Sequence, residues 1–208
     1  MRVLGIDPGT RVTGYGVVDR GKGGLLIHLL DGCVKTDPAM SLPDRLVAIR
    51  EAIDGIIEGC GPDAVAVESI FFAKNAKSAI MLGHARGVIL QSAASRGLPV
   101  FEYAPRAIKL AVTGYGNAAK GQIQKMVKLL LKTGKPAGAD AADALAAAIC
   151  HIHHVRPVRV PHPAPLADTD ASLNAKSRTS EWCGGGDKEG VIAGQKAAHV
   201  TGSTKTGA

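Results

Sequence analysis

Residues 2–19 have the sequence RVLGIDPGTRVTGYGVVD and decide the fold. Two short runs rich in β-branched and other apolar residues, 2–7 and 12–19, flank a turn that contains Pro8 and Gly9. Proline and glycine supply the backbone conformations that tight turns need, so we predict that the two runs form a hairpin. The first strand ends in Asp7, which places a carboxylate at the carboxyl end of an apolar strand.

The remaining periodicity predicts an α/β domain. Residues 42–56 carry apolar side chains at spacings of three and four behind Ser41, a good N-cap, and this pattern is typical of an amphipathic helix. The order β-β-β-α-β-α-β-α-α-α indicates a sheet with a parallel part. The other predicted strands cover 25–36, 64–68 and 100–103, and the other predicted helices cover 78–97, 105–112, 122–132 and 139–153.

Composition divides the chain into two parts. The 208 residues are 46% hydrophobic, enough for one sizeable core. From residue 156 onward, prolines cluster, three glycines follow one another at 184–186, and apolar periodicity is almost lost. Such a segment cannot bury enough surface to offset its ordering entropy. We therefore predict a folded domain over 1–155 and a Pro/Gly/Ser-rich, mostly disordered tail over 156–208.

Charge, hydropathy and cysteine spacing narrow the class of protein. The formal net charge is +7 and the pI is about 9.4, which favours a polyanionic partner such as nucleic acid. The longest apolar run, 144–150, is far shorter than the ~18–20 residues of a membrane-spanning helix. No signal-peptide pattern precedes the first strand, so we expect a soluble, cytoplasmic protein without membrane contact. The cysteines lack metal-ligand spacing and are predicted to be reduced thiols: Cys33, Cys60, Cys150 and Cys183.

Four acids are candidate metal ligands. Asp7 and Glu68 each end an apolar strand, and ligands bind at the carboxyl ends of strands in open α/β sheets. Asp140 and Asp143, three residues apart, project from one face of the Ala-rich helix. No neighbouring Lys or Arg in the sequence neutralises the four carboxylates, so divalent ions such as Mg²⁺ or Mn²⁺ are predicted. Two such ions would support hydrolysis of a phosphodiester.

Each of these acids also has a purely structural explanation. Asp7 could start a turn, and Glu68 could face solvent. Asp140 could cap the helix, and Asp143 could be a first-turn acid that the helix dipole favours. The metal-site hypothesis therefore depends on all four acids converging.

Basic and aromatic residues near these acids are candidates for DNA binding. Phe71 and Phe72 lie between Glu68 and the next helix, close in sequence to Lys74 and Lys77, a composition suited to base stacking with phosphate contacts, and one of the pair is expected to be core. Lys109 and Lys120 flank a glycine-containing loop and could hold a phosphate. Arg106 is a further basic residue and a candidate for DNA binding. Each of these lysines, taken singly, could also be an ordinary surface residue that only interacts with solvent.

The end of the last predicted helix carries three histidines, at 151, 153 and 154. His151 follows Asp143 by about two turns, so it could support the acid site. We favour the alternative that the histidines interact with the helix C-terminus. The small residues Gly83, Ala85 and Gly87 allow close approach of another backbone, from the sheet or from a second subunit.

Ordered motifs resemble those of the RuvC-type Holliday junction resolvases. The resemblance covers roughly residues 1–155 and includes GIDPGT at 5–10, ESIF at 68–71, AKNA at 73–76, GHARG at 83–87, YAP at 103–105 and DAADALA at 140–146. It implies a ribonuclease H-like fold, a mixed five-stranded sheet flanked by helices. It also implies a homodimer that nicks two opposing strands of a four-way junction.

The resemblance also suggests roles for individual residues. It implies that Asp7, Glu68, Asp140 and Asp143 are the catalytic acids, which bind two Mg²⁺ ions per subunit, with Mn²⁺ as a substitute. It places Phe71 at the junction-inserting aromatic position, and Lys109 and Lys120 at basic positions that support cleavage. It further implies cooperation with a branch-migration helicase complex of the RuvA and RuvB type. Nothing carries over to the tail.

Three other classes are alternatives. The DPGT sequence at 7–10 also resembles the phosphate loop of actin-like ATPases and sugar kinases, but the chain has no second copy of that domain. A protein that only binds junctions has no use for four converging acids. A nuclease of the same superfamily that acts on RNA is distinguished only by comparing substrates.

Overall fold

One mixed sheet, with strand order β5-β4-β1-β2-β3-β6, organises the chain. The computed structural model describes residues 1–69, 76–134, 137–155 and 200–202. In chain order the elements are β1 (Arg2–Asp7), β2 (Val12–Arg20), the 3₁₀ helix η1 (Lys22–Gly24), β3 (Leu26–Lys35), α1 (Leu42–Cys60), β4 (Ala64–Glu68), α2 (Ala76–Ser95), β5 (Val100–Tyr103), α3 (Pro105–Thr113), α4 (Lys120–Leu131), α5 (Ala139–His154) and β6 (Val200–Gly202).

The sheet combines both pairing modes. β1 and β2 pair antiparallel, as do β2 and β3, whereas β4 is parallel to β1 and β5 is parallel to β4. The parallel strands are joined by helices, because a crossover must return the chain to the same end of the sheet. These five strands confirm the predicted mixed five-stranded sheet with flanking helices.

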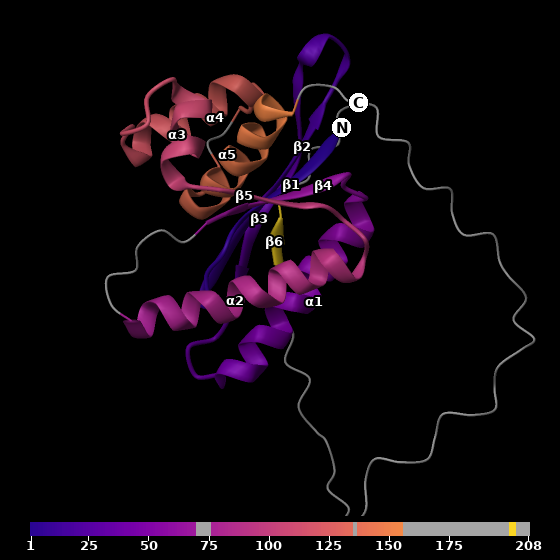
Figure 1. Ribbon diagram of the computed structural model, residues 1–208, viewed down its shortest axis with the longest axis vertical. Coiled ribbons are helices and arrows are strands. Elements are labelled where there is room, and N and C mark those ends of the chain that lie inside the picture. The colour runs from indigo at the N-terminus through magenta and orange to yellow at the C-terminus, as the bar shows by residue number, and fades with distance from the viewer. Residues whose placement is uncertain (70–75, 135–136, 156–199, 203–208) are drawn as a thin grey trace, which may run out of the picture. The chain divides into compact units, whose positions relative to one another are not determined.

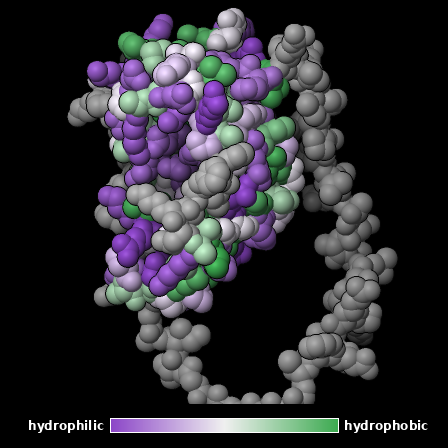
Figure 2. Space-filling model, turned by 60° about the vertical axis from the view of Figure 1, so that its left-hand side comes forward, coloured by the Kyte–Doolittle hydropathy of each residue, from purple (hydrophilic) through white to green (hydrophobic). Residues whose placement is uncertain are grey.

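Helices cover both faces of the sheet (Figure 1). On one face α1 and α2 pack on side chains that alternate along the strands, including Leu4, Ile6 and Val67. On the opposite face α3, α4 and α5 pack on Val3, Val18 and Ala66. The central strands β1 and β4 are buried on both faces, which explains their continuous apolar sequence. The visible surface in Figure 2 is mostly hydrophilic.

Local signals set most element ends. The Ser41 hydroxyl accepts a hydrogen bond from the Asp44 amide at the start of α1, which confirms the predicted N-cap. Gly61 ends the same helix in a left-handed conformation that favours glycine. Predicted and observed ends differ by one or two residues elsewhere. Thus α2 begins at Ala76 and α4 at Lys120.

One strand was not predicted. Within the segment assigned to the tail, Val200–Gly202 forms β6 and pairs antiparallel with Gly32–Val34 of β3. Backbone hydrogen bonds form this pairing, and they require no apolar periodicity, so the sequence pattern gave no signal. The predicted disorder of the rest of the tail concerns 156–199 and 203–208, which lie outside the described residues.

None of the helices in the described part of the chain combines the length and the apolarity that a bilayer crossing requires.

Candidate active site

Asp7 and Glu68 lie side by side at one edge of the sheet. β1 and β4 are parallel neighbours, and Ile6 is in register with Val67. The next residue of each strand is the acid. The prediction that the two carboxylates meet at the carboxyl ends of adjacent parallel strands is therefore confirmed, and both side chains are partly buried.

Glycines bring α5 onto this edge of the sheet. A Cβ atom at Gly5 of β1 would overlap the backbone oxygen of Ala144, and one at Gly14 of β2 would overlap the backbone oxygen of Asp140. The backbone of α5 therefore rests directly on the two strands, closer than any side chain on them would permit. The first turns of α5, which carry Asp140 and Asp143, are thereby held against the end of β1.

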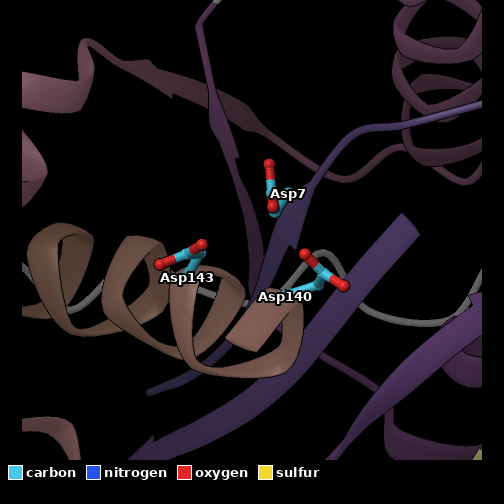
Figure 3. A group of neighbouring side chains, drawn as sticks. All are labelled: Asp7, Asp140 and Asp143. Atoms are coloured by element: carbon cyan, nitrogen blue, oxygen red, sulfur yellow. The ribbon is translucent and has the colours of Figure 1, made fainter. Parts of the chain in front are cut away.

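Three carboxylates converge at that point. One oxygen from each of Asp7, Asp140 and Asp143 lies within 4.8 Å of the others, and Figure 3 shows the three side chains around the end of β1. Burial, and then repulsion by Glu68, Asp143 and Asp140, raises the pKa of Asp7 from 3.8 to about 7. Such a group of hard oxygen donors, whose mutual repulsion raises the pKa of Asp7, is suited to a divalent cation.

Glu68 completes the acid cluster from the other strand. Burial and the charge of Asp143 raise its pKa, whereas a hydrogen bond with Asp7 and the charges of Lys120 and Lys109 act in the opposite direction. The hydrogen bond with Asp7 favours the ionised form of Glu68. The structure therefore brings together all four acids that the sequence singled out.

Two predicted lysines lie beside these acids. The Lys120 Nζ is 2.8 Å from Asp143 Oδ2, and this contact raises the pKa of Lys120. The sequence analysis considered only residues near the acids in the chain and predicted that no Lys or Arg neutralises them. That prediction is wrong for Asp143, because Lys120 of α4 forms an ion pair with it. Lys109 and Lys120 both line an open pocket of about 250 Å³, together with Glu68, Asp143, Pro105, Ile108, Ile123 and Ala146.

The other predicted DNA-binding residues lie farther out or outside the described residues. Lys77 is exposed in the first turn of α2, and Arg106 is exposed in the first turn of α3. Phe71 and Lys74 fall within 70–75, outside the described residues. The proposed DNA contacts of these four residues remain predictions.

His151 has a structural role. Its side chain is buried, its Nδ1 is 2.8 Å from the Tyr103 hydroxyl, and its ring lies against that of Phe101. Burial lowers the pKa of His151, and no carboxylate contributes to that shift. In the described part of the chain, its side chain contacts Tyr103 and Phe101 of β5. His154 fits the capping interpretation, since its Nδ1 lies 2.8 Å from the Cys150 backbone oxygen.

Sequence reasoning missed a thiol at the edge of the acid cluster. Burial and the charge of Asp140 raise the pKa of Cys33 on β3, and the Ala141 amide donates a hydrogen bond to its sulfur. No spacing rule connects Cys33 with a helix more than a hundred residues away. The glycines of β1 and β2, in contrast, were a usable signal for close helix packing.

Comparisons with known proteins agree with this geometry. Residues 3–151 match the family model of crossover junction endodeoxyribonuclease RuvC. The RuvC protein of Trichlorobacter lovleyi is 52% identical over 153 residues, covering 74% of this chain and 85% of the relative. That of Pelobacter propionicus is 49% identical over 167 residues, covering 78% and 94%.

Solved structures give the same result. Thermus thermophilus RuvC has a TM-score of 0.68 and 37% identity, covering 74% of this chain and 94% of that protein. The yeast mitochondrial Holliday junction resolvase Ydc2, at 15% identity and a TM-score of 0.55, shares the fold. The chain therefore belongs to the RuvC family of crossover junction endodeoxyribonucleases.

Proposed function

We propose that this chain resolves Holliday junctions by symmetric, metal-dependent nicking of two opposing strands. The products would carry 5′-phosphate and 3′-hydroxyl ends that a ligase can seal, as homologous recombination and DNA repair require. The observation that carries the proposal is the convergence of Asp7, Asp140 and Asp143 beside two lysines. The Thermus thermophilus RuvC structure with a Holliday junction substrate, 36% identical to this chain, supports the choice of substrate.

The acid cluster would hold the metal ions. Asp7, Glu68, Asp140 and Asp143 offer only hard oxygen donors, which suit Mg²⁺, with Mn²⁺ as a substitute, and we propose two ions per subunit. Bound ions of this kind supply an activated water and stabilise the leaving oxygen of a phosphodiester. Burial, and then the charges of the other three acids, raise the pKa of Asp7 to about 7, and a bound cation would relieve that repulsion, which supports this assignment.

The lysines would hold the DNA backbone. Lys120 is in contact with Asp143 in the free protein, and its flexible side chain would exchange that carboxylate for a phosphate oxygen of the DNA. Lys109, which lines the same pocket, would contact the same or a flanking phosphate. Phe71 would stack on an unpaired base, and Lys74, Lys77 and Arg106 would contact the arms of the junction.

The assembly follows from the substrate. A four-way junction has two equivalent strands to cut, so a homodimer with one acid cluster per subunit fits its symmetry. We further propose cooperation with a branch-migration helicase complex of the RuvA and RuvB type. The enzyme would act in the cytoplasm, the compartment that holds the DNA in which such junctions form.

Cleavage of a synthetic four-way junction tests the proposal. With Mg²⁺, we expect paired, symmetric, ligatable nicks, and no nicks without metal. Asp7→Asn is expected to bind the junction within about threefold of the wild type, because DNA affinity depends on the basic surface. Its cleavage rate should fall by at least about 1000-fold.

Duplex and RNA substrates serve as controls in the same assay. Equal cleavage of duplex DNA, or preference for RNA, would contradict the proposed substrate. Loss of junction binding in Asp7→Asn together with loss of cleavage would show that Asp7 is structural.

A further inference from the structure

The turn between β1 and β2 follows Asp7 directly. It comprises residues 8–11, and Pro8 is its first residue. The parallel pairing of β1 with β4 ends at Ile6, whereas Asp7 still pairs with Gly14 of β2. Asp7 is thus held by β2 on one side and continues straight into the turn. The conformation of the turn therefore influences where the Asp7 carboxylate points.

A buried hydroxyl of β2 holds the start of this turn. The side chain of Thr13 is fully buried, and its Oγ1 donates a hydrogen bond to the Gly9 backbone oxygen at 2.6 Å. The same Oγ1 accepts a hydrogen bond from the Gly9 amide at 3.4 Å. A hydroxyl can donate once and accept twice, so both bonds can form together. Because a buried polar group without a partner is costly, Thr13 and Gly9 hold each other in place.

A second threonine holds the remainder of the turn. Thr36, which follows β3 and is 8% exposed, donates from its Oγ1 to the Thr10 backbone oxygen at 2.7 Å. Its amide donates to the Arg11 backbone oxygen at 3.1 Å. Three consecutive backbone oxygens, at residues 9, 10 and 11, therefore accept hydrogen bonds from Thr13 or Thr36. Connecting loops are ordinarily more mobile than the strands they join, and these bonds restrain this one.

The backbone of the turn has little room to shift. A Cβ atom at Gly9 would lie 2.1 Å from the Val12 backbone oxygen, so the turn is closed tightly on itself. Pro8, between Asp7 and Gly9, has its φ angle fixed by its ring. Few torsions are therefore free between the hydrogen-bonded Gly9 and Asp7, and the position of Gly9 is transmitted to the acid.

We propose that the Thr13 hydroxyl is a positioning group for the acid cluster, because it holds the turn that follows Asp7. This role rests on the proposed metal-dependent function. One oxygen of Asp7 lies within 4.8 Å of oxygens of Asp140 and Asp143, and Figure 3 shows the three side chains. Mg²⁺ demands near-ideal octahedral geometry with ligands at about 2.0–2.1 Å, so a displacement of Asp7 by more than about 0.5 Å should weaken its binding.

Two substitutions of Thr13 separate its hydroxyl from its methyl group. Thr13→Val keeps the branched shape and removes the hydroxyl, so the affinity for Mg²⁺ should fall about tenfold or more. Thr13→Ser keeps the hydroxyl and loses the methyl group, so it should bind Mg²⁺ within about twofold of the wild type, although its fold is less stable. Calorimetric titration of the metal-free, full-length proteins with Mg²⁺ measures these affinities. Equal affinities of Thr13→Val and the wild type would overturn the role.

Ser92→Ala controls for a general loss of stability. Ser92 of α2 is likewise fully buried, and its hydroxyl donates a hydrogen bond to Asp54 of α1. Its removal should lower the midpoint of urea denaturation, as Thr13→Val does, and leave the Mg²⁺ affinity unchanged. A comparable loss of Mg²⁺ affinity in Ser92→Ala would show that Thr13→Val acts through stability, and would overturn the positioning role.

Hydrogen exchange gives a readout that needs no metal. Thr13→Val should speed exchange of the Gly9 and Thr36 amides about tenfold or more, and Thr13→Ser should not. Unchanged exchange in Thr13→Val would overturn the proposal, because the turn would then keep its conformation without the hydroxyl. Failure of the wild type to bind Mg²⁺ would contradict the proposed function together with this role, whereas wild-type affinity in Thr13→Val would overturn the role alone.

Discussion

At the scale of single residues, the raised pKa of Asp7 makes the stability of the fold depend on pH. Its carboxylate is partly buried, and three other acids perturb it, so its pKa in the folded protein is raised to about 7 from an ordinary value of 3.8. A folded state that binds the proton more tightly than the unfolded state loses stability as pH rises through this window. The penalty is absent below about pH 4 and complete above about pH 7.

Asp7→Asn should therefore stabilise the metal-free protein at pH 8. The amide removes one repelling charge, and we expect the free energy of unfolding to rise by about 1–3 kcal/mol, with the gain shrinking toward pH 4. Urea denaturation in the presence of a chelator at both pH values measures the effect. Glu51→Gln, an exposed acid distant in sequence from the cluster, is the control. An equal gain at both pH values would contradict the assigned cause.

One substitution separates the observed ion pair of Lys120 with Asp143 from its proposed contact with a DNA phosphate. Lys120→Ala removes the ion pair with Asp143, which competes with a bound cation, so the Mg²⁺ concentration for half-maximal thermal stabilisation should fall about two- to tenfold. Cleavage at saturating Mg²⁺ should nevertheless fall about 10- to 100-fold, because a phosphate contact is lost. Lys125→Ala on the same helix should change neither quantity. If Lys120→Ala weakened Mg²⁺ binding, the competition would be refuted.

At the scale of elements, the position of α5 on the sheet builds the site. The helix is rich in alanine, and the strands below it carry glycine, so both surfaces permit close approach. Arg20 of β2 donates hydrogen bonds to the backbone oxygens of Ile152 and Val155 and so holds the other end of the helix. The separation of Asp140 and Asp143 from Asp7 depends on this packing.

Gly14→Ala should displace the acid-bearing end of α5. The new Cβ would overlap the Asp140 backbone oxygen, so the helix must move, at a cost of about 1–3 kcal/mol. Cleavage should fall together with Mg²⁺ affinity, since the ligands no longer converge. Gly55→Ala in α1, where a Cβ meets nothing within 4 Å, should instead stabilise the fold by about 0.5–1 kcal/mol. Denaturation and metal titration of both variants check this, and an unchanged Mg²⁺ affinity in Gly14→Ala would contradict it.

At the scale of the whole molecule, the proposed dimer would cut two strands with two separate acid clusters. Each cluster, as described, is built from β1, β4 and α5 of a single chain. A mixed dimer of wild-type and Asp7→Asn subunits should therefore introduce one nick per junction and leave the opposing strand intact. Mapping of nicks on both strands with tagged heterodimers measures this. Two nicks or none from the mixed dimer would refute independent sites.

Much of the fold was predictable because its signals are local. Each of these signals depends on residues that are close together in the sequence. They are the strand-turn-strand sequence at 2–19, the spacing of apolar residues in α1 and the continuous apolar sequence of β4. Asp7 and Glu68 were also accessible, because a strand's end and its parallel partner follow from topology. Asp140 and Asp143 could be assigned to the site only together with Asp7 and Glu68, because helix capping and the helix dipole explain them when they are taken alone.

By itself, the sequence determined the order of the elements apart from η1 and β6, the presence of one sizeable core and the four candidate acids, since these depend on periodicity and chain order. Tertiary structure alone decided that Lys120 neutralises Asp143, that His151 bonds Tyr103, that Cys33 lies near Asp140 and that β6 extends the sheet. Each of these contacts joins residues far apart in the chain. Their distances are set by how closely helices rest on the sheet, and no local pattern contains that information.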